Sequence, residues 1–172
     1  MVHNSFNISA RVISFNSLMD LLGDSTIGAD KVLRNLSLCG TLIRGNWVLQ
    51  SDYLYPTGCV SAINGVSAEY LCRARDYVLF KLTKHDNLSR QKISSITQLP
   101  QQEAKEVLES VAHLKPNKLW DLLKPPDHDF EKKHPELVQR QEVFFKAQEE
   151  KFNEMESEKN EKRIRKKSVK SS

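Results

Sequence analysis

The stretch Thr41-Leu-Ile-Arg-Gly-Asn-Trp-Val-Leu-Gln50 organises the rest of this chain, because it has the pattern of a β-hairpin. Apolar and polar residues alternate on both sides of Gly45-Asn46, a pair that accepts the positive φ of a tight turn. Trp47 follows the turn and supplies a large apolar face to bury. We therefore predict two antiparallel strands joined at Gly45-Asn46, with the hairpin running on through Pro56.

A weaker form of this pattern recurs further along the chain, in Ala112-His-Leu-Lys-Pro-Asn-Lys-Leu-Trp-Asp-Leu-Leu123. Pro116-Asn117 is the expected turn, and Trp120 is the counterpart of the first tryptophan. Short helical patterns precede both hairpins. Helices closed by a two-stranded hairpin that carries a tryptophan make a winged-helix unit. The sequence therefore predicts an α+β, mostly helical protein with two winged-helix units in tandem.

The first unit is expected to span residues 1–57 and to be incomplete. Near its start lies a weak strand-like alternation, Ile8 to Ile13. Apolar residues then recur at helical spacing from Phe15 to Leu22. A second amphipathic helix is predicted from Gly28 to Leu38. Two helices and a hairpin leave this unit one helix short of a whole winged helix, so we expect an exposed apolar face on it.

The second unit is expected to be complete and to span residues 67–124, after a glycine-containing linker at 58–66. Apolar stripes at helical spacing predict three helices, Ser67 to Lys84, about Ser89 to Gln98, and Gln101 to Ala112. The second hairpin follows the third helix directly.

The C-terminal part of the chain is predicted to be extended, then helical, then disordered. Residues 125–134 form a proline-rich connector, because paired prolines disfavour helix. A long, charged helix with a narrow apolar stripe is expected over 135–157. Nothing remains to be buried in residues 158–172, so a basic disordered tail is predicted there.

The net charge of +4 is concentrated near the C-terminus. Residues 146–172 contain nine Lys or Arg and six Glu, a balance of +3, which leaves +1 for the first 145 residues. A folded part this close to neutral lacks the broad basic surface of a domain whose main task is to grip phosphates. The run Lys162 to Lys167 has three interpretations: a nuclear import signal, a nonspecific nucleic-acid arm, or a solubilising tail.

No membrane partner is expected, because no apolar run approaches the roughly 20 residues of a membrane span. We also expect no catalytic site, cofactor or small-molecule substrate, since the sequence has no glycine-rich phosphate loop, no Gly-x-Ser-x-Gly and no His-Glu-x-x-His. Asp127-His128-Asp129 with His134 has the residue types of a metal site. We interpret this group as an exposed polar linker, because no second cluster completes a coordination sphere, and we expect no metal.

Winged helices often bind DNA through their third helix and their hairpin, so a DNA-binding transcription factor is the alternative function. The third helix of the second unit carries Glu103, Glu106 and Glu109, which we expect to face solvent and to repel phosphates. In the first unit the candidate contacts to a DNA backbone are Lys31, Arg34, Arg44 and Asn46. We prefer the simpler interpretation that these residues belong to an ordinary solvated face.

A protein-binding surface fits the residue types better. Tyrosine, arginine and phenylalanine are enriched at protein interfaces. The candidate partner-binding residues are Tyr70, Arg73, Arg75, Tyr77, Phe144 and Phe145. The alternative is that the same residues pack the two units together. We expect the two tryptophans to be core anchors of their hairpins and not stacking platforms.

Three motifs in this order resemble one known family. They are Gly45-Asn-Trp-Val48 with Leu54-Tyr-Pro56, Gly65-Val-Ser-Ala-Glu-Tyr-Leu-Cys-Arg-Ala-Arg-Asp76, and Lys132-Lys-His-Pro-Glu-Leu-Val-Gln-Arg-Gln141. The chain closely resembles, from about Phe15 to Phe145, the family of the fifth RPC subunit of eukaryotic RNA polymerase III. The similar region is the central, tandem winged-helix part of that subunit.

The resemblance implies a nuclear, non-catalytic subunit that supports initiation and termination on tRNA, 5S and other short RNA genes. It also implies a TFIIF-like heterodimer partner, other polymerase subunits as neighbours, and transient contact with promoter DNA. The chain departs from the family pattern because it lacks the N-terminal dimerisation part and a second winged-helix pair, so it resembles a fragment. Ser67 and Ala74 stand where proline and glycine are expected.

Overall fold

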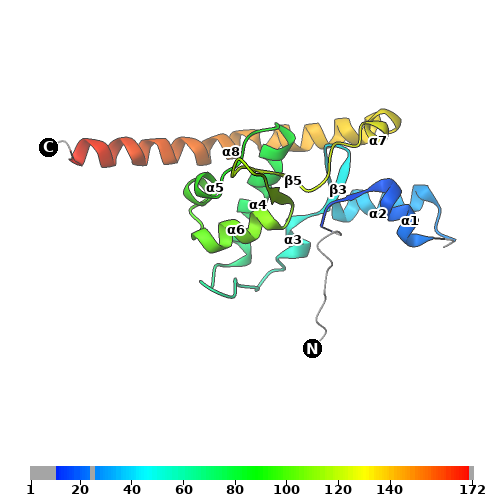
Figure 1. The fold of residues 1–172 in the computed structure, drawn as a ribbon, viewed down its shortest axis with the longest axis horizontal. Helices are drawn as coiled ribbons and strands as arrows, with labels where there is room; N and C mark the ends of the chain where they lie inside the picture. Colours follow the sequence, from blue (N-terminus) through cyan, green and yellow to red (C-terminus); the bar gives the residue numbers. More distant parts are fainter. Residues whose placement is uncertain (1–10, 24–25, 171–172) are drawn as a thin grey trace.

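A computed structural model describes residues 11–23 and 26–170. In chain order the elements are β1 (Ile13–Ser14), α1 (Phe15–Leu22), α2 (Ala29–Cys39), β2 (Gly40–Ile43), β3 (Asn46–Leu49), α3 (Ser51–Leu54), α4 (Ala68–Thr83), α5 (Arg90–Thr97), α6 (Gln101–Glu109), β4 (Ala112–Leu114), β5 (Trp120–Leu122), α7 (His128–Lys133) and α8 (Pro135–Lys170). This is the mostly helical α+β fold that the sequence predicts. Figure 1 shows α8 running along one side of the body and projecting past it.

The first hairpin forms, but its turn lies one residue earlier than predicted. Arg44 and Gly45 are the turn residues, both with positive φ (50° and 76°), as a type I′ turn requires. Asn46 already pairs with Ile43 across the ladder. The cause is tertiary, because a Cβ at Gly45 would come within 2.3 Å of the Asp127 carbonyl oxygen. The residue with no side chain must therefore sit where the later connector crosses the turn.

The sheet around this hairpin has the order β1-β3-β2, with β3 in the centre and all pairs antiparallel. Much of the predicted strand from Ile8 to Ile13 lies outside the described residues. Beyond β3 the hairpin does not run on to Pro56, because the chain turns into the short helix α3. The two helices predicted for this part are confirmed as α1 and α2.

The second hairpin also forms, with the predicted turn residues at its tip. The N–H of Lys115 donates to the carbonyl of Leu119, and the left-handed Lys118 (φ 63°) completes the loop after Pro116 and Asn117. The helix before it ends at Glu109 and not at Ala112 as predicted. Ala112 instead opens β4, where it pairs with Leu122.

One hydrophobic core joins the two parts of the chain. Helix α4 lies at its centre and buries residues on every side, including Leu71, Val78 and Phe80. Residues from the first sheet and from α8 complete this core, namely Val12, Ile43, Val48, Phe145 and Phe152. A second cluster joins Trp47 to Leu42, Phe130 and the start of α8. Trp47 and Trp120 are 4% and 7% exposed, which confirms them as core anchors.

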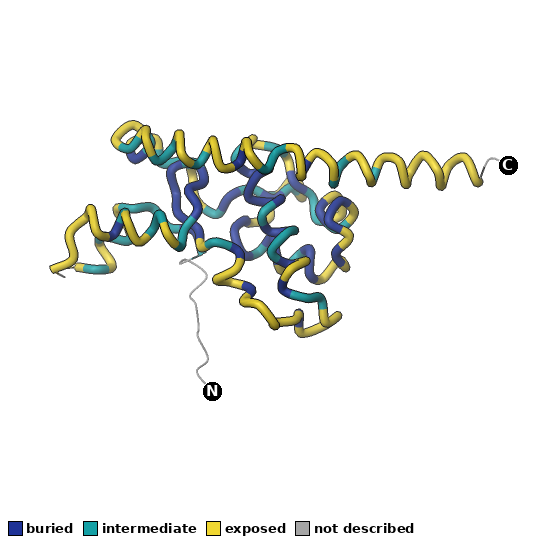
Figure 2. Tube along the Cα trace, turned by 180° about the vertical axis from the view of Figure 1, so that it is seen from behind, coloured by how far each residue is buried: buried dark blue, intermediate teal, exposed yellow. Residues whose placement is uncertain are grey.

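The C-terminal region is more helical than predicted. A short helix, α7, forms inside the predicted connector, where the Asp127 side chain accepts a hydrogen bond from the N–H of Phe130. Helix α8 begins at Pro135 as expected but continues to Lys170, so the predicted end near Ser157 and the disordered tail are wrong for the described residues. Figure 2 shows the end of α8 beyond the body, where almost every residue is exposed. Residues 171–172 lie outside the described range.

Candidate interaction surfaces

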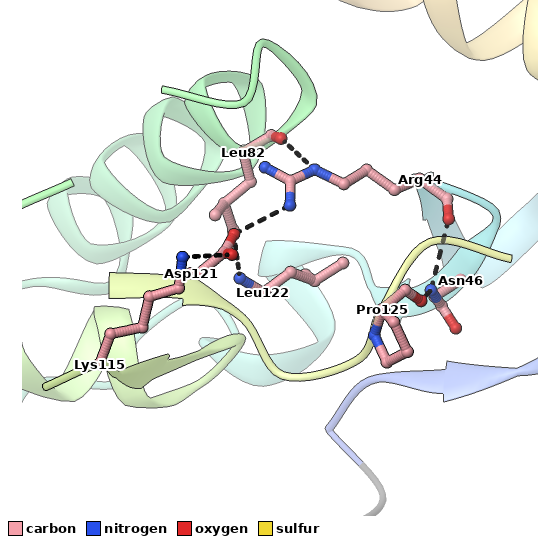
Figure 3. A network of polar contacts seen from close by, with 7 residues as sticks. All are labelled: Arg44, Asn46, Leu82, Lys115, Asp121, Leu122 and Pro125. Atoms are coloured by element: carbon pink, nitrogen blue, oxygen red, sulfur yellow. Dashed lines mark hydrogen bonds and ion pairs between the residues drawn. The ribbon is translucent and has the colours of Figure 1, made fainter. Parts of the chain in front are cut away.

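A polar network at the first turn joins the N-terminal sheet to the second hairpin (Figure 3). Arg44 Nε donates to the carbonyl oxygen of Leu82 at 2.7 Å, and Arg44 Nη1 lies 2.9 Å from Asp121 Oδ1. Lys115 Nζ lies 3.1 Å from the other carboxylate oxygen. The arginine side chain is only 9% exposed. Its contacts explain why a residue other than glycine adopts positive φ in this turn.

Because of this network, the stability of the chain should fall at acid pH. Burial alone would raise the pKa of Asp121, but hydrogen bonds from Arg44, Lys115 and the N–H of Leu122 lower it from 3.8 to about 2. A lowered pKa adds stability above pH 3.8, and this contribution is lost as the pH falls toward 2. We expect Asp121→Asn to cost about 1–2 kcal/mol at pH 7, allowing for solvent screening of this partly exposed group.

Urea unfolding of both proteins at pH 7, 4 and 2 measures this difference in unfolding free energy. It should shrink between pH 4 and pH 2. A difference that stays the same at all three pH values would contradict the assigned role of the Asp121 carboxylate.

The same turn is held by the connector that leads to α7. Asn46 Nδ2 donates to the carbonyl oxygens of Pro125 at 2.8 Å and Arg44 at 3.3 Å, and the N–H of Asp127 donates to the Arg44 carbonyl at 2.9 Å. Asn46 is 1% exposed. The structure therefore speaks against Arg44 and Asn46 as contacts to a DNA backbone, because both side chains are engaged inside the fold. Lys31 and Arg34 on α2 are exposed.

Arg75 is also turned inward and makes a second junction. It is 1% exposed and donates to the carbonyl oxygen of Leu49 at 2.7 Å, to Ser51 Oγ at 3.0 Å and to Ser110 Oγ at 3.1 Å. These partners come from β3, α3 and the end of α6. The prediction that Arg75 binds a partner protein is wrong in this structure, and the packing alternative holds for it.

Tyr77 and Phe145 likewise pack within the chain. Tyr77 is fully buried, and its hydroxyl donates to Glu156 Oε1 at 2.6 Å. Phe145 is 6% exposed, and its ring centroid lies 6.2 Å from that of Phe80. Both residues therefore dock α8 on α4 and are not free to bind a partner, and their contacts are with α8 and not between the two predicted units.

Three of the predicted partner-binding residues do reach solvent. Tyr70 is 52% exposed, and the guanidinium carbon of Arg73, which is partly exposed, lies 5.1 Å from the centroid of the Tyr70 ring. Phe144 is 49% exposed on α8, beside the buried Phe145. Exposed aromatic and arginine side chains of this kind are typical of protein interfaces. We refer to Tyr70, Arg73 and Phe144 as the exposed contact residues.

The acidic face expected on α6 is smaller than predicted. Glu103 is 1% exposed, and its carboxylate accepts hydrogen bonds from Ser61 Oγ at 2.8 Å and from the backbone and side chain of Asn64. It fixes the 57–66 loop and does not face solvent. Glu106 is exposed and Glu109 is partly exposed. The argument from charge repulsion against DNA therefore rests on two carboxylates and not on three.

A cleft with a volume of about 650 Å³ lies between the first turn, the end of α4 and α8. Its walls carry both signs of charge, and Lys84 Nζ pairs with Glu149 Oε1 at 3.3 Å. The hydroxyl in its lining, that of Thr83, donates to the carbonyl oxygen of Phe80. The lining thus offers no hydroxyl paired with a base for nucleophilic chemistry.

Residues 11–23 and 26–170 contain no group of three or more His, Cys, Asp or Glu that could hold a metal ion. None of the helices in these ranges combines the length and apolar character needed to cross a membrane. Of the residues of the expected polar linker, Asp127 caps α7 and His128 pairs with Glu131 at 3.1 Å.

Comparison with known proteins gives one consistent result. Residues 2–154 match a family model described as RPC5 protein. The chain is 41% identical over 137 residues to the DNA-directed RNA polymerase III subunit RPC5 of Homo sapiens, and 40% identical to that of Mus musculus. Each match covers 80% of this chain and 19% of the relative. The chain therefore spans about a fifth of the length of these curated relatives.

Proposed function

This chain belongs to the RPC5 family, and on that premise we propose that it serves as a non-catalytic, structural and protein-binding part of RNA polymerase III. In that role it supports initiation and termination on tRNA, 5S and other small RNA genes. Its partners are other polymerase III subunits, especially a TFIIF-like heterodimer partner, and it acts in the nucleus. The whole-protein activity is proposed by analogy with relatives about four times its length.

The main support for this proposal is that the charged residues of the interior hydrogen-bond within the chain. Arg44, Arg75 and Glu103 all form hydrogen bonds with the backbone or side chains of neighbouring elements. Such groups hold elements in one arrangement, and these three side chains are buried and hydrogen-bonded within the chain. A body fixed in this way suits a module that presents a constant surface to partner subunits.

We further propose that the body consists of two tandem winged-helix units, residues 1–57 and 67–124, with the first incomplete. The order of helices followed by a hairpin in each part supports this division. The helices α7 and α8 cover the face that the first unit would otherwise expose, since Phe130, Leu137 and Val138 pack on Trp47. The exposed contact residues are the proposed partner-binding site. Lys31 and Arg34 are the proposed points of transient contact with promoter DNA.

The experiment that tests the proposal is recovery of the polymerase with the tagged endogenous protein. We expect mass spectrometry to find RNA polymerase III subunits in near-equal amounts to the tagged protein. The triple variant Tyr70→Ala, Arg73→Ala, Phe144→Ala should lower that recovery at least tenfold while keeping the thermal midpoint of the isolated chain. Matched substitutions at Lys118 and Lys124, which lie away from these residues, should not lower it. Recovery without any polymerase III subunit would overturn the proposal.

A further inference from the structure

The projecting end of α8 carries basic residues on one face. Helical spacing places Lys159, Lys162, Arg163 and Lys166 within about 60° of one line along the helix, with Glu161 on the opposite side and Glu158 at the edge of the basic face. These residues lie in the exposed part of α8 (Figure 2), where only Lys159 is partly covered.

A fifth cation joins this face from another element. Lys92 lies on α5, which packs against α8, and its charge acts on Lys159. Burial and then the charges of Arg163 and Lys92 lower the pKa of Lys159. We call Lys92, Lys159, Lys162, Arg163 and Lys166 the cationic stripe.

The stripe is not neutralised by the chain itself. None of its five side chains forms an ion pair with any described residue. The nearest carboxylate on the same face, Glu156, is already bound by Lys81 Nζ at 2.6 Å and by the Tyr77 hydroxyl. The same two contacts fix the place where α8 leaves the body. The cations on α8 therefore belong to a helix whose position on the body is fixed by contacts of the preceding turn.

From this arrangement we propose that the cationic stripe binds the phosphate backbone of double-stranded DNA. The stripe on α8 runs about 10 Å, and duplex DNA presents one negative charge for roughly each 1.7 Å of its axis, so each cation has phosphates within reach. A straight α-helix also fits the width of the major groove.

Other anionic partners fit less well. Single strands are bound through stacking on aromatic rings, and α8 has no aromatic residue after Phe152. A membrane surface requires an apolar face opposite the charges. The exposed apolar residues here, Ile164 and Val169, are five positions apart and so lie on different faces of the helix. This inference does not depend on membership of a polymerase, because it concerns the isolated chain.

The test is a salt titration of fluorescence anisotropy with a labelled 20-base-pair duplex and the 172-residue chain. Five phosphate contacts predict a slope of log affinity against log salt of about −4.5, which is on the order of a 500-fold loss between 50 and 200 mM salt. The triple variant Lys159→Gln, Arg163→Gln, Lys166→Gln should reduce the magnitude of that slope by about 3. Lys92→Gln alone should reduce it by about 1.

Lys124→Gln is the matched control, because this exposed lysine lies in the connector and outside the stripe. It should leave the slope unchanged. An unchanged slope in the triple variant or in Lys92→Gln would overturn the proposal, as would an equal effect of the control. Tighter binding of a single strand of equal charge, or of a polyglutamate peptide, would also overturn it, because the preferred ligand would then not be duplex DNA.

Discussion

Replacing Arg75 with alanine is expected to lower the free energy of unfolding by about 3–5 kcal/mol. The guanidinium is 1% exposed and satisfies a carbonyl on β3 together with two hydroxyls, those of Ser51 and Ser110. Its removal leaves these buried acceptors without a donor and opens a cavity beside α4. Since the acceptors come from both parts of the chain, the loss also weakens their attachment to each other.

Urea unfolding followed by far-UV circular dichroism measures this change. Arg73→Ala is the matched control, because Arg73 lies on the same helix but stacks on the exposed Tyr70. It should cost less than about 1 kcal/mol. Equal effects of the two substitutions would show that the buried hydrogen bonds of Arg75 do not hold the parts together.

Replacing Phe152 with alanine is expected to cost about 3–5 kcal/mol. Phe152 is 1% exposed, and its ring centroid lies 4.9 Å from that of Phe80 and 5.9 Å from that of Tyr77. Among the described residues it is the last fully buried apolar side chain of α8, followed only by the partly buried Met155, so the helix beyond it should lose most of its support. Hydrogen exchange of the amides after Phe152 should accelerate by a larger factor than exchange in α6.

Phe144→Ala provides the control for this second prediction. The same residue type is lost from the same helix, but at a position that is 49% exposed. We expect a cost below about 1 kcal/mol and unchanged exchange in the end of α8. A large loss of stability from Phe144→Ala, with little from Phe152→Ala, would reverse the assignment of the packed and exposed faces of α8.

The elements that were predicted best are those whose signals are local. Helix α1 has the predicted bounds, because Ser14 accepts the N–H of Ser17 at its start and Gly23 adopts positive φ at its end. Helix α5 is similar, since Ser89 accepts the N–H of Lys92. Caps and glycines act within a few residues of the element that they limit, so one sequence is enough to place them.

The misplaced turn and the misassigned site residues have a common cause. The turn at Gly45 is set by the backbone of Asp127, which lies 82 positions later in the sequence. Arg75 and Glu103 look like surface residues in a helical pattern, but partners from distant elements, the carbonyl of Leu49 and the loop side chain of Asn64, draw them inward. The spacing of residues along one helix gives no information about where such distant partners lie.

Helix α8 is longer than predicted for a different reason. The disordered tail at residues 158–172 is predicted because a segment with no apolar residues to bury usually stays disordered. Helix-favouring Glu, Lys and Arg dominate this segment, and the packed turns around Phe152 and Met155 supply the nucleus on which further turns can add. Propagation from a docked nucleus needs no further burial.

We propose that this chain presents the exposed contact residues to partner subunits inside RNA polymerase III. Site-specific photo-crosslinking tests this proposal, with a photoreactive amino acid placed at Tyr70 or at Phe144 of the tagged full-length protein. The predicted result is a crosslink from at least one of these positions to another polymerase III subunit, identified by mass spectrometry, and none from a probe placed at the buried Phe152. An assembled polymerase that contains the protein but gives no crosslink from either exposed position would contradict the claim.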